Sequence, residues 1–450
     1  MIGQQTTDNR LQTTDNGHFN KMNIKELYNI FLQHPIITTD SRDVPKGSIF
    51  FALKGENFNG NAYAKAALEK GAAFAVIDEQ KYAEAGDERL IIVEDVLSAL
   101  QQLAKQHRTH IGTTIIGITG TNGKTTTKEL IAAVLKKKYN VLYTQGNLNN
   151  HIGVPKTLLQ LNKEHQIAVI EMGANHPGEI KALTEIVQPD YGIITNVGKA
   201  HLLGFGSFEG VIHTKGELYD FLREDCGTAF INNDNPHLQA ISTGLRLIRY
   251  GQQANDELLT QGELLECNPF LKFKWGEHIC QTQLIGSYNL DNALAAACIG
   301  TFFAVPDEDI NAALEGYAPS NNRSQLTITE KNRLVVDAYN ANPTSMQAAL
   351  DNFKLMPDGR KMCILGDMKE LGEASAEEHQ KTIDTLCEYG FEAVWLVGEE
   401  FAKTKHPATF RTFADVTEAK ESIKVSKPEG FTILIKGSNS TKLVQLAELL

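Results

Sequence analysis

The sequence predicts an α/β protein of three domains. These are a small N-terminal α/β domain, a central doubly wound and mostly parallel sheet with a phosphate loop, and a C-terminal Rossmann-like domain. From Ile111 onward, apolar strands alternate with helical segments, which is typical of a parallel sheet. A glycine-rich loop joins the first of these strands to a helix, and a second alternating series begins after Pro319. A chain of 450 residues is also too long for a single hydrophobic core.

Changes in composition predict the domain boundaries. Residues 1–21 contain the polar, nearly repeated segment "QTTDNRLQTTDNGHFN", which offers no core, so we expect a disordered leader. The predicted domains then span residues 22–108, 109–318 and 319–450, with a hinge in "YAPSNNRSQ".

Hydrophobic patterning predicts the elements of each domain in turn. In the first domain we expect a helix over 24–32, a turn-rich loop with an apolar strand within 38–60, a helix and strand within 62–78, and a helix near 98–106. The central strands are predicted at 114–120, 140–144, 167–173, 191–197 and 227–233, followed by an antiparallel addition within 244–284 and a helix over 289–304. The last domain has predicted strands at 333–340, 361–367, 393–398 and 431–438.

Composition argues against several classes of function. A net charge of −12 disfavours a nucleic-acid surface, which needs a basic patch. No apolar run approaches the roughly 18 residues of a membrane span, so we expect none. The six cysteines are scattered without a C-x-x-C pair, which predicts neither disulfides nor zinc and favours the reducing cytoplasm.

The loop in "IIGITGTNGKTTTKEL" predicts a nucleotide-phosphate site. Its glycines stand at 117, 120 and 123 before Lys124 and Thr125, whereas the strict motif would place a glycine at the position of Ile118. Glycines let backbone N–H groups close around phosphate oxygens, and the following helix adds its dipole. Lys124 is expected to reach the β- and γ-phosphates, and Thr125 to offer its hydroxyl to magnesium. The alternative is a glycine turn that precedes a lysine by chance.

Three more residues near the predicted strand ends are candidates. Glu171 ends an apolar strand, where magnesium would want an oxygen ligand, although a solvated carboxylate is the plainer interpretation. His201 follows another strand, and a lone histidine is more often an ordinary loop residue. Lys215 lies on the next predicted helix. It suits a metal site only if carbon dioxide carbamylates its amine, and from the residues alone it is a surface lysine.

The remaining candidates lie at a helix start and around the hinge. Asn289 and Asn292 begin a helix, where capping by Asn289 is the safer interpretation and an adenine contact the alternative. Arg323 at the hinge is either a solvated linker residue or a phosphate contact. Asp337, Tyr339 and Asn340 follow the first strand of the third domain, which a closing motion would bring to the nucleotide.

Seven segments together resemble the Mur ligase family, over nearly all of residues 22–450 and in the right order: "GITGTNGKTTTKE", "GNLNNHIGVP", "AVIEMGANHPGEI", "TNVGKAHLLGFGS", "GSYNLDNALAA", "VVDAYNANPTSM" and "LGDMKELGE". The resemblance implies an N-terminal uridine-nucleotide domain, a central ATPase domain and a closing C-terminal domain. The "DAYNANPTSM" and "NNHIGVP" segments favour the members that join D-alanyl-D-alanine to UDP-N-acetylmuramoyl-tripeptide. Such a ligase uses ATP and an acyl phosphate, and we expect it to act as a monomer.

The resemblance also implies roles for single residues. Phosphates of ATP would be held by Gly120, Thr121, Asn122, Gly123, Lys124, Thr125 and Thr126. Magnesium would be served by Thr125, Glu171, His201 (directly or through water) and carbamylated Lys215, and the nucleotide would also be contacted by Asn289, Arg323 and Asp337. Substrates would meet Ser41, Arg42, Asn149, Asn150, Tyr339 and Asn340.

Two departures from the family pattern weaken only the substrate-side assignments. His151 stands where an acidic residue is common, and Asn439 stands where arginine is frequent. The alternative functions are a sister ligase that accepts another amino acid, a folylpolyglutamate synthase, or a nucleotide-dependent switch. A switch would hydrolyse ATP without needing either the amine or the muramyl peptide.

Overall fold

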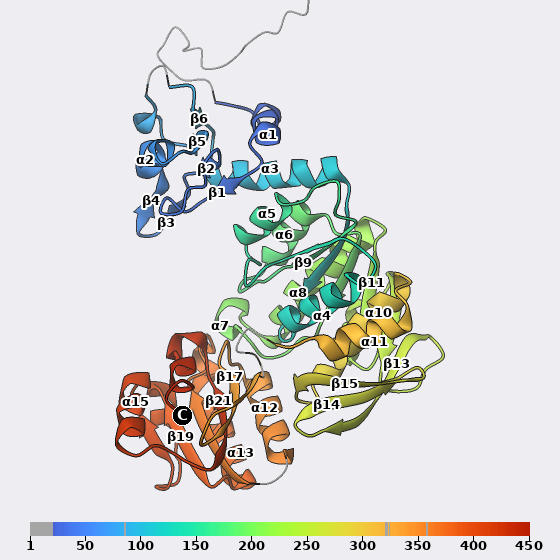
Figure 1. Ribbon diagram of the computed structural model, residues 1–450, viewed down its shortest axis with the longest axis vertical. Helices are drawn as coiled ribbons and strands as arrows, with labels where there is room; N and C mark the ends of the chain where they lie inside the picture. The colour runs from blue at the N-terminus through green and yellow to red at the C-terminus, as the bar shows by residue number, and fades with distance from the viewer. Residues whose placement is uncertain (1–20, 85–86, 320–322, 324, 357–358) are drawn as a thin grey trace, which may run out of the picture. The chain divides into compact units, whose positions relative to one another are not determined.

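The computed structural model describes residues 21–84, 87–319, 323, 325–356 and 359–450 (Figure 1). Residues 1–20 of the predicted leader lie outside the described residues. The chain forms two compact units, the first comprising the described part of 1–114 with 147–166 and 185–188, and the second comprising the rest. Among the described residues, no helix combines the length and the apolar character that crossing a bilayer requires.

The first unit is built on a small parallel sheet in the order β1-β2-β5-β6. The strands are β1 (Ile37–Thr38), β2 (Ile49–Phe51), β5 (Phe74–Ile77) and β6 (Leu90–Ile92), with a hairpin of β3 (Lys54–Gly55) and β4 (Phe58–Asn59). The helices are α1 (Ile24–Gln33), α2 (Ala64–Glu69), α3 (Val96–Ile111) and α5 (Gly153–Leu158). A capping box at Asn23 and Glu26 starts α1. The helix α3 runs past residue 108, where the sequence predicted a domain boundary.

A nine-stranded sheet forms the centre of the second unit, in the order β15-β14-β13-β12-β11-β10-β7-β9-β8. Its parallel part consists of β7 (Thr114–Thr119), β8 (Val141–Tyr143), β9 (Ile167–Glu171), β10 (Tyr191–Ile194), β11 (Thr228–Asn232) and β12 (Arg246–Gly251). The antiparallel addition predicted within 244–284 is present as β13 (Leu258–Cys267), β14 (Phe270–Trp275) and β15 (His278–Ile285). The prediction is wrong for β12, which lies in the same range but pairs in parallel with β11 and β13. The predicted strands and the α/β class are thereby confirmed.

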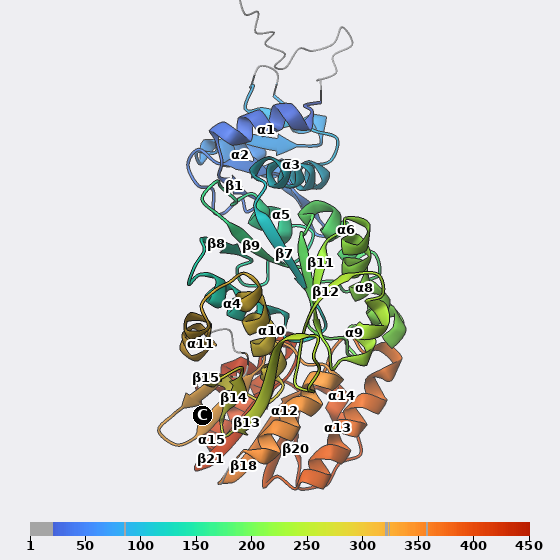
Figure 2. The same cartoon turned by 90° about the vertical axis from the view of Figure 1, so that its right-hand side faces the viewer.

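Helices cover both faces of the parallel strands, as Figure 2 shows. The helices α4 (Lys124–Leu135), α10 (Asn289–Phe302) and α11 (Asp307–Gly316) contact one another, and their apolar residues share a core with the sheet. The helices α8 (Phe208–Glu224) and α9 (Pro236–Ile241) contact β11. The chain also forms α6 (Glu179–Val187) and the short α7 (Leu202–Phe205). Because helices cover the middle of this sheet, the side chains of β7, β9, β10 and β11 are almost all buried.

A second sheet of six strands, in the order β16-β17-β21-β18-β19-β20, ends the second unit. The strands are β16 (Gln325–Ile328), β17 (Arg333–Asp337), β18 (Arg360–Gly366), β19 (Ala393–Val397), β20 (Arg411–Phe413) and β21 (Phe431–Lys436), and all pairs except β16–β17 are parallel. The helices are α12 (Pro343–Leu355), α13 (Ser375–Tyr389), α14 (Glu399–Ala402) and α15 (Val416–Val425). Two apolar clusters cover its opposite faces, one with α12 and α13 and the other with α15.

Candidate active site

The glycine-rich loop connects the buried strand β7 to the start of α4. Its last glycine, Gly123, caps α4 with a φ of 77°, a conformation that costs other residues about 1–2 kcal/mol. A Cβ atom at Gly123 would lie 2.6 Å from the side-chain oxygen of Asn292. Glycine is therefore required both by the backbone turn and by the close approach of α10.

The turn that follows β10 holds this loop in place. The amides of Thr121 and Asn122 donate to the backbone and side-chain oxygens of Asn196, at 2.9 and 3.0 Å. The hydroxyl of Thr195 donates to the carbonyl of Asn122 at 2.6 Å. Sequence reasoning missed Thr195 and Asn196, although the polar "TN" directly after an apolar strand was a signal for such a role.

Lys124 folds back over the loop from which it comes. Its ammonium donates to the carbonyls of Gly120 and Thr121, at 2.6 and 3.0 Å. Burial, opposed by the charge of Glu171 and aided by that of Arg323, lowers the pKa of Lys124 to about 8. The ammonium is thus held where the loop would surround a phosphate. Phosphate oxygens could replace the two carbonyl oxygens that now accept its hydrogen bonds.

Thr125 and Glu171 meet at the same edge of the sheet. The Thr125 hydroxyl donates to the Glu171 carboxylate, with oxygen distances of 3.0 and 3.2 Å, and both side chains are buried. Hydroxyl and carboxylate oxygens are the hard ligands that magnesium prefers, so the pair fits that ion. Within the described ranges, no three His, Cys, Asp or Glu side chains gather as a metal site. Magnesium would therefore also depend on phosphate oxygens and other ligands.

His201 and Lys215 lie close enough for their charges to interact. His201 has a φ of 50° before α7, and its side chain contacts the carboxylate of Glu370. Burial lowers the pKa of His201, and the charges of Lys124 and Lys215 lower it further, whereas Glu370 raises it. Glu370 was not among the predicted residues.

Lys215 lies inside α8 and is only 2% exposed, so its interpretation as a surface lysine is wrong. Its ammonium nitrogen donates to the carbonyl of Ala174 at 3.3 Å and lies 5.0 Å from the ring centre of Phe205. Burial lowers its pKa to about 7, with a further contribution from the charge of Lys124. A buried amine with this pKa is largely neutral at slightly alkaline pH and can act as a nucleophile.

The asparagines at the start of α10 are arranged differently from the capping prediction. Asn289 is the first residue of the helix, and its amide donates to the carbonyl of Ile285 at 2.8 Å, so capping by Asn289 is wrong. Its side-chain oxygen accepts from Asn292, whose own oxygen accepts from the hydroxyl of Thr127. This buried chain of hydrogen bonds fixes α10 against α4.

Arg323, from the predicted hinge, and the residues after β17 form a second group. The Arg323 guanidinium lies 3.9 Å from the ring centre of Tyr339. The Nε of Arg323 is buried and has no hydrogen-bond partner among the described residues, so this donor is available to a ligand. Asp337 accepts a 2.5 Å hydrogen bond from the buried Lys436, which also donates to the carbonyl of Asn340 at 3.4 Å.

Within the second unit, the phosphate loop contacts the segment after β17. The side-chain amide of Asn342 donates to that of Asn122 at 2.8 Å. Lys199, in the turn after β10, pairs with Glu378 of α13 at 3.0 Å. Residues that the sequence analysis assigned to two different domains therefore contact each other.

The four predicted substrate residues of the first unit are held by local contacts. The exposed Arg42 pairs with Asp40 at 2.7 Å and holds the pKa of that carboxyl well below its usual range, while the carbonyl of Ser41 accepts from Lys70. The side-chain oxygen of Asn150 accepts from the amides of residues 152 and 153 at the start of α5. The amide of Asn149 donates to the carbonyl of residue 147.

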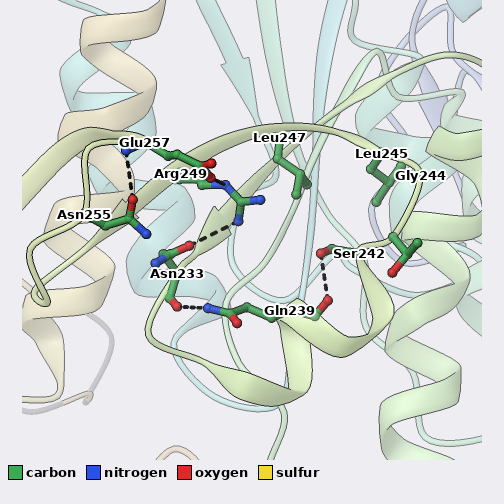
Figure 3. Close-up of a pocket in the computed structure, with 10 residues that line it drawn as sticks. Asn233, Gln239, Ser242, Gly244, Leu245, Leu247, Arg249, Asn255 and Glu257 are labelled. Carbon is green, nitrogen blue, oxygen red and sulfur yellow. Dashed lines mark hydrogen bonds and ion pairs between the residues drawn. The ribbon is translucent and has the colours of Figure 1, made fainter.

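A separate polar pocket of about 530 Å³ lies between residues 233 and 257 (Figure 3). In it, Arg249 pairs with Glu257 at 2.9 Å and donates to Asn233 at 3.1 Å, so its charge is already balanced. None of the predicted site residues lines this pocket.

We expect Gly123→Ala to destabilise the protein more than Gly112→Ala. Gly112, which ends α3, has a φ of 71° and open space around its missing Cβ, so alanine there costs about 1 kcal/mol of strain. At Gly123 the clash with Asn292 adds about 1–3 kcal/mol and displaces the phosphate loop. Urea unfolding of both variants and titration with ADP measure these effects. Equal losses of stability, with unchanged ADP binding, would contradict the prediction.

Comparisons with known proteins cover almost the whole chain. Three family models match: "Mur ligase family, catalytic domain" over residues 35–108, "Mur ligase middle domain" over 118–300, and "Mur ligase, glutamate ligase domain" over 322–439. A relative from Bacillus subtilis, UDP-N-acetylmuramoyl-tripeptide--D-alanyl-D-alanine ligase, is 35% identical, and the match covers 92% of each chain.

Two solved structures give the same result. The crystal structure of MurF from Acinetobacter baumannii is 30% identical with a TM-score of 0.82, and the match covers 96% of this chain and 95% of that one. MurF ligase from Thermotoga maritima in complex with ADP is 26% identical with a TM-score of 0.81, over 93% and 97%. The motifs, the fold and these matches agree: the chain belongs to the Mur ligase family.

Proposed function

We propose that the chain is the ATP-dependent ligase that joins D-alanyl-D-alanine to UDP-N-acetylmuramoyl-tripeptide. The products are UDP-N-acetylmuramoyl-pentapeptide, ADP and phosphate, in the synthesis of peptidoglycan precursors. The observation that carries the proposal is the phosphate loop whose Thr125 bonds Glu171, in a chain that matches a ligase of this name over 92% of its length. As a Mur ligase, the chain is a peptide-forming enzyme.

The phosphate loop serves to activate a carboxylate. An ionised carboxylate is a poor electrophile, and an amine does not displace its oxygen. Transfer of the γ-phosphoryl group of ATP onto the tripeptide carboxylate gives an acyl phosphate with a good leaving group. The amine of D-alanyl-D-alanine then attacks the acyl carbon, and the tetrahedral intermediate expels phosphate. Lys124 and the loop amides offset the negative charge on the phosphate oxygens during the transfer.

The proposed metal ligands are Thr125, Glu171, His201 (directly or through water) and carbamylated Lys215. Magnesium, when bound there, would neutralise phosphate charge and orient the phosphate oxygens. The hydrogen-bonded oxygen pair of Thr125 and Glu171 supports this assignment. ATP would also be held by residues 120–126, Asn289, Arg323 and Asp337. The buried Nε of Arg323 without a partner among the described residues supports its place in that set.

Carbamylation of Lys215 would turn a repelling cation into a metal ligand. The neutral amine attacks carbon dioxide, a C–N bond forms, and one proton leaves, so that an anionic carbamate replaces the ammonium. The reaction needs a deprotonated amine, and the lowered pKa of Lys215 supports it. A carbamate also supplies two oxygen atoms, as a carboxylate does.

We expect the carbamate to form with rising pH. At a pH below its pKa of about 7, the Lys215 amine holds its proton and cannot attack carbon dioxide. The carbamate fraction should therefore rise between about pH 6 and pH 8. NMR of the protein in ¹³C-labelled bicarbonate measures the carbamate signal. The same experiment on Lys215→Met is the control, and an identical signal from both proteins would contradict the assignment.

The substrate-side roles of Ser41, Arg42, Asn149, Asn150, Tyr339 and Asn340 belong to the same proposal. His151 and Asn439 depart from the family pattern in these regions and are candidates for altered substrate contacts. The six cysteines carry free thiols, which supports a reducing compartment, and we propose the cytoplasm. That the enzyme acts as a monomer stays a prediction, which light scattering in solution tests.

Phosphate release tests the reaction. The protein is given ATP and magnesium with the tripeptide and the dipeptide, separately and together, and the product is weighed by mass spectrometry. Release that needs both substrates and yields a pentapeptide supports the proposal, and parallel lysine and diaminopimelate tripeptides identify the preferred acceptor. Phosphate release that needs neither substrate would instead indicate a nucleotide-dependent switch. Ligation of a different amine would indicate a sister ligase.

A further inference from the structure

Lys128 is a fully buried lysine that the proposed reaction does not use. It lies on α4, three residues after Thr125 and four after Lys124, so its side chain neighbours each of these two on the helix surface. Its exposed fraction is 0%, which is rare for a lysine because its charge loses its hydration.

The ammonium of Lys128 lies between three segments of the second unit. Its nitrogen is 3.4 Å from the carboxylate of Glu171 at the end of β9, and the exposed fractions of the two side chains are 0% and 1%. It donates to the carbonyl of Gly146 at 3.4 Å and lies 6.0 Å from the ring centre of Tyr143. Lys128 thus joins the metal-side carboxylate to the segment that follows β8.

A buried carboxylate needs a cation nearby. The Thr125 hydroxyl gives Glu171 a hydrogen bond but no charge. The charge of Lys124 also attracts this carboxylate, but its ammonium donates to loop carbonyls, whereas the ammonium of Lys128 lies 3.4 Å from the carboxylate. Removal of one partner from a buried ion pair is strongly destabilising because the other charge stays buried. Any metal that binds Glu171 must share this carboxylate with the ammonium of Lys128 or displace it.

We propose that Lys128 is a positioning residue that balances the charge of Glu171 while no metal is bound, and that it thereby suppresses magnesium binding in the absence of nucleotide. This inference rests on the proposed metal role of Glu171. Magnesium is usually held by one or two carboxylates together with substrate phosphates. With ATP present, the added phosphate charge outweighs the competing ammonium, so the metal enters and leaves with the nucleotide.

Thermal unfolding with magnesium chloride alone tests the proposal. Wild-type protein, Lys128→Met and the control Lys137→Met are compared without nucleotide, with choline chloride to match ionic strength. Lys137 is exposed in the turn that follows α4. Without metal, we expect the melting temperature of Lys128→Met to lie about 5 °C or more below that of the other two proteins. Added magnesium should restore part of this lost stability. The magnesium concentration that gives half of the maximal rise in melting temperature should be at least about 10-fold lower for Lys128→Met than for the other two proteins. Equal responses in all three proteins would overturn the proposal.

The variant Lys128→Met/Glu171→Gln separates charge from packing. If the loss in Lys128→Met comes from an unbalanced carboxylate, the added Glu171→Gln restores stability and abolishes the magnesium response. If Lys128→Met does not fold, folding of the double variant still supports the proposal. A double variant that is no more stable than Lys128→Met, or that also fails to fold, overturns it. Ligation by the wild-type protein is measured separately, so failure of this inference is distinguishable from failure of the proposed function.

Discussion

Replacement of Lys124 by methionine should lower the rate of ligation by roughly 1,000-fold, because one preorganised cation on a transferring phosphoryl group contributes on this scale. The fold should survive. Among the described residues, the hydrogen bonds of the ammonium go to carbonyls of its own loop, at Gly120 and Thr121, and methionine keeps much of the apolar stem. Phosphate release and product mass, measured with both substrates, report the loss.

Two controls make this result specific. Lys124→Met should unfold at nearly the same temperature as the wild-type protein, and it should still bind the muramyl tripeptide. Lys137→Met, which removes an exposed lysine in the turn that follows α4, should ligate normally. Full turnover in Lys124→Met would remove the loop lysine from the mechanism.

Loss of Lys215 should also abolish most of the ligation. We expect Lys215→Met and Lys215→Arg each to lower activity by about 100-fold or more, since loss of a group that serves a metal typically has at least this effect. Arginine tests the chemistry because it keeps the positive charge but cannot form the proposed carbamate. Steady-state ligation with saturating bicarbonate measures both variants.

The comparison between these two variants distinguishes the roles of Lys215. If activity needs a carbamate, both variants fail alike, and the apparent magnesium requirement rises in each. If Lys215→Arg retains most of the wild-type rate, the site needs a cation, and the carbamate assignment is wrong. Because Lys215 is buried in α8, melting curves are recorded for each variant to separate unfolding from loss of chemistry.

Much of the fold could be predicted because it depends on local patterns. Buried strands such as β9 appear in the sequence as short apolar runs, and the glycines of the phosphate loop mark the connection from β7 to α4. Even the antiparallel strands β13 to β15 were visible as a change to alternating character. These signals need only neighbouring residues.

The site was less predictable because its contacts join residues that are distant in sequence. Asn289 looked like a helix cap, but its partner is the carbonyl of Ile285, and its oxygen belongs to a chain that reaches Thr127 on α4. From the residues alone Lys215 looked like a surface lysine, and Lys128 was not singled out, yet the packing of α8 and α4 buries both side chains. Periodicity does not reveal such burial, since one lysine hardly changes the hydrophobic pattern of a helix.

The position of β21 has a consequence for how the protein is made. This strand follows β16 to β20 along the chain, yet it lies between β17 and β18 in the middle of its sheet. During translation, β17 and β18 therefore emerge without the strand that joins them, and the edge that carries Asp337 stays incomplete until residues 431–436 leave the ribosome. Any premature stop before residue 431 would leave two exposed half-sheets, which are substrates for proteases and for aggregation, and not a shortened enzyme.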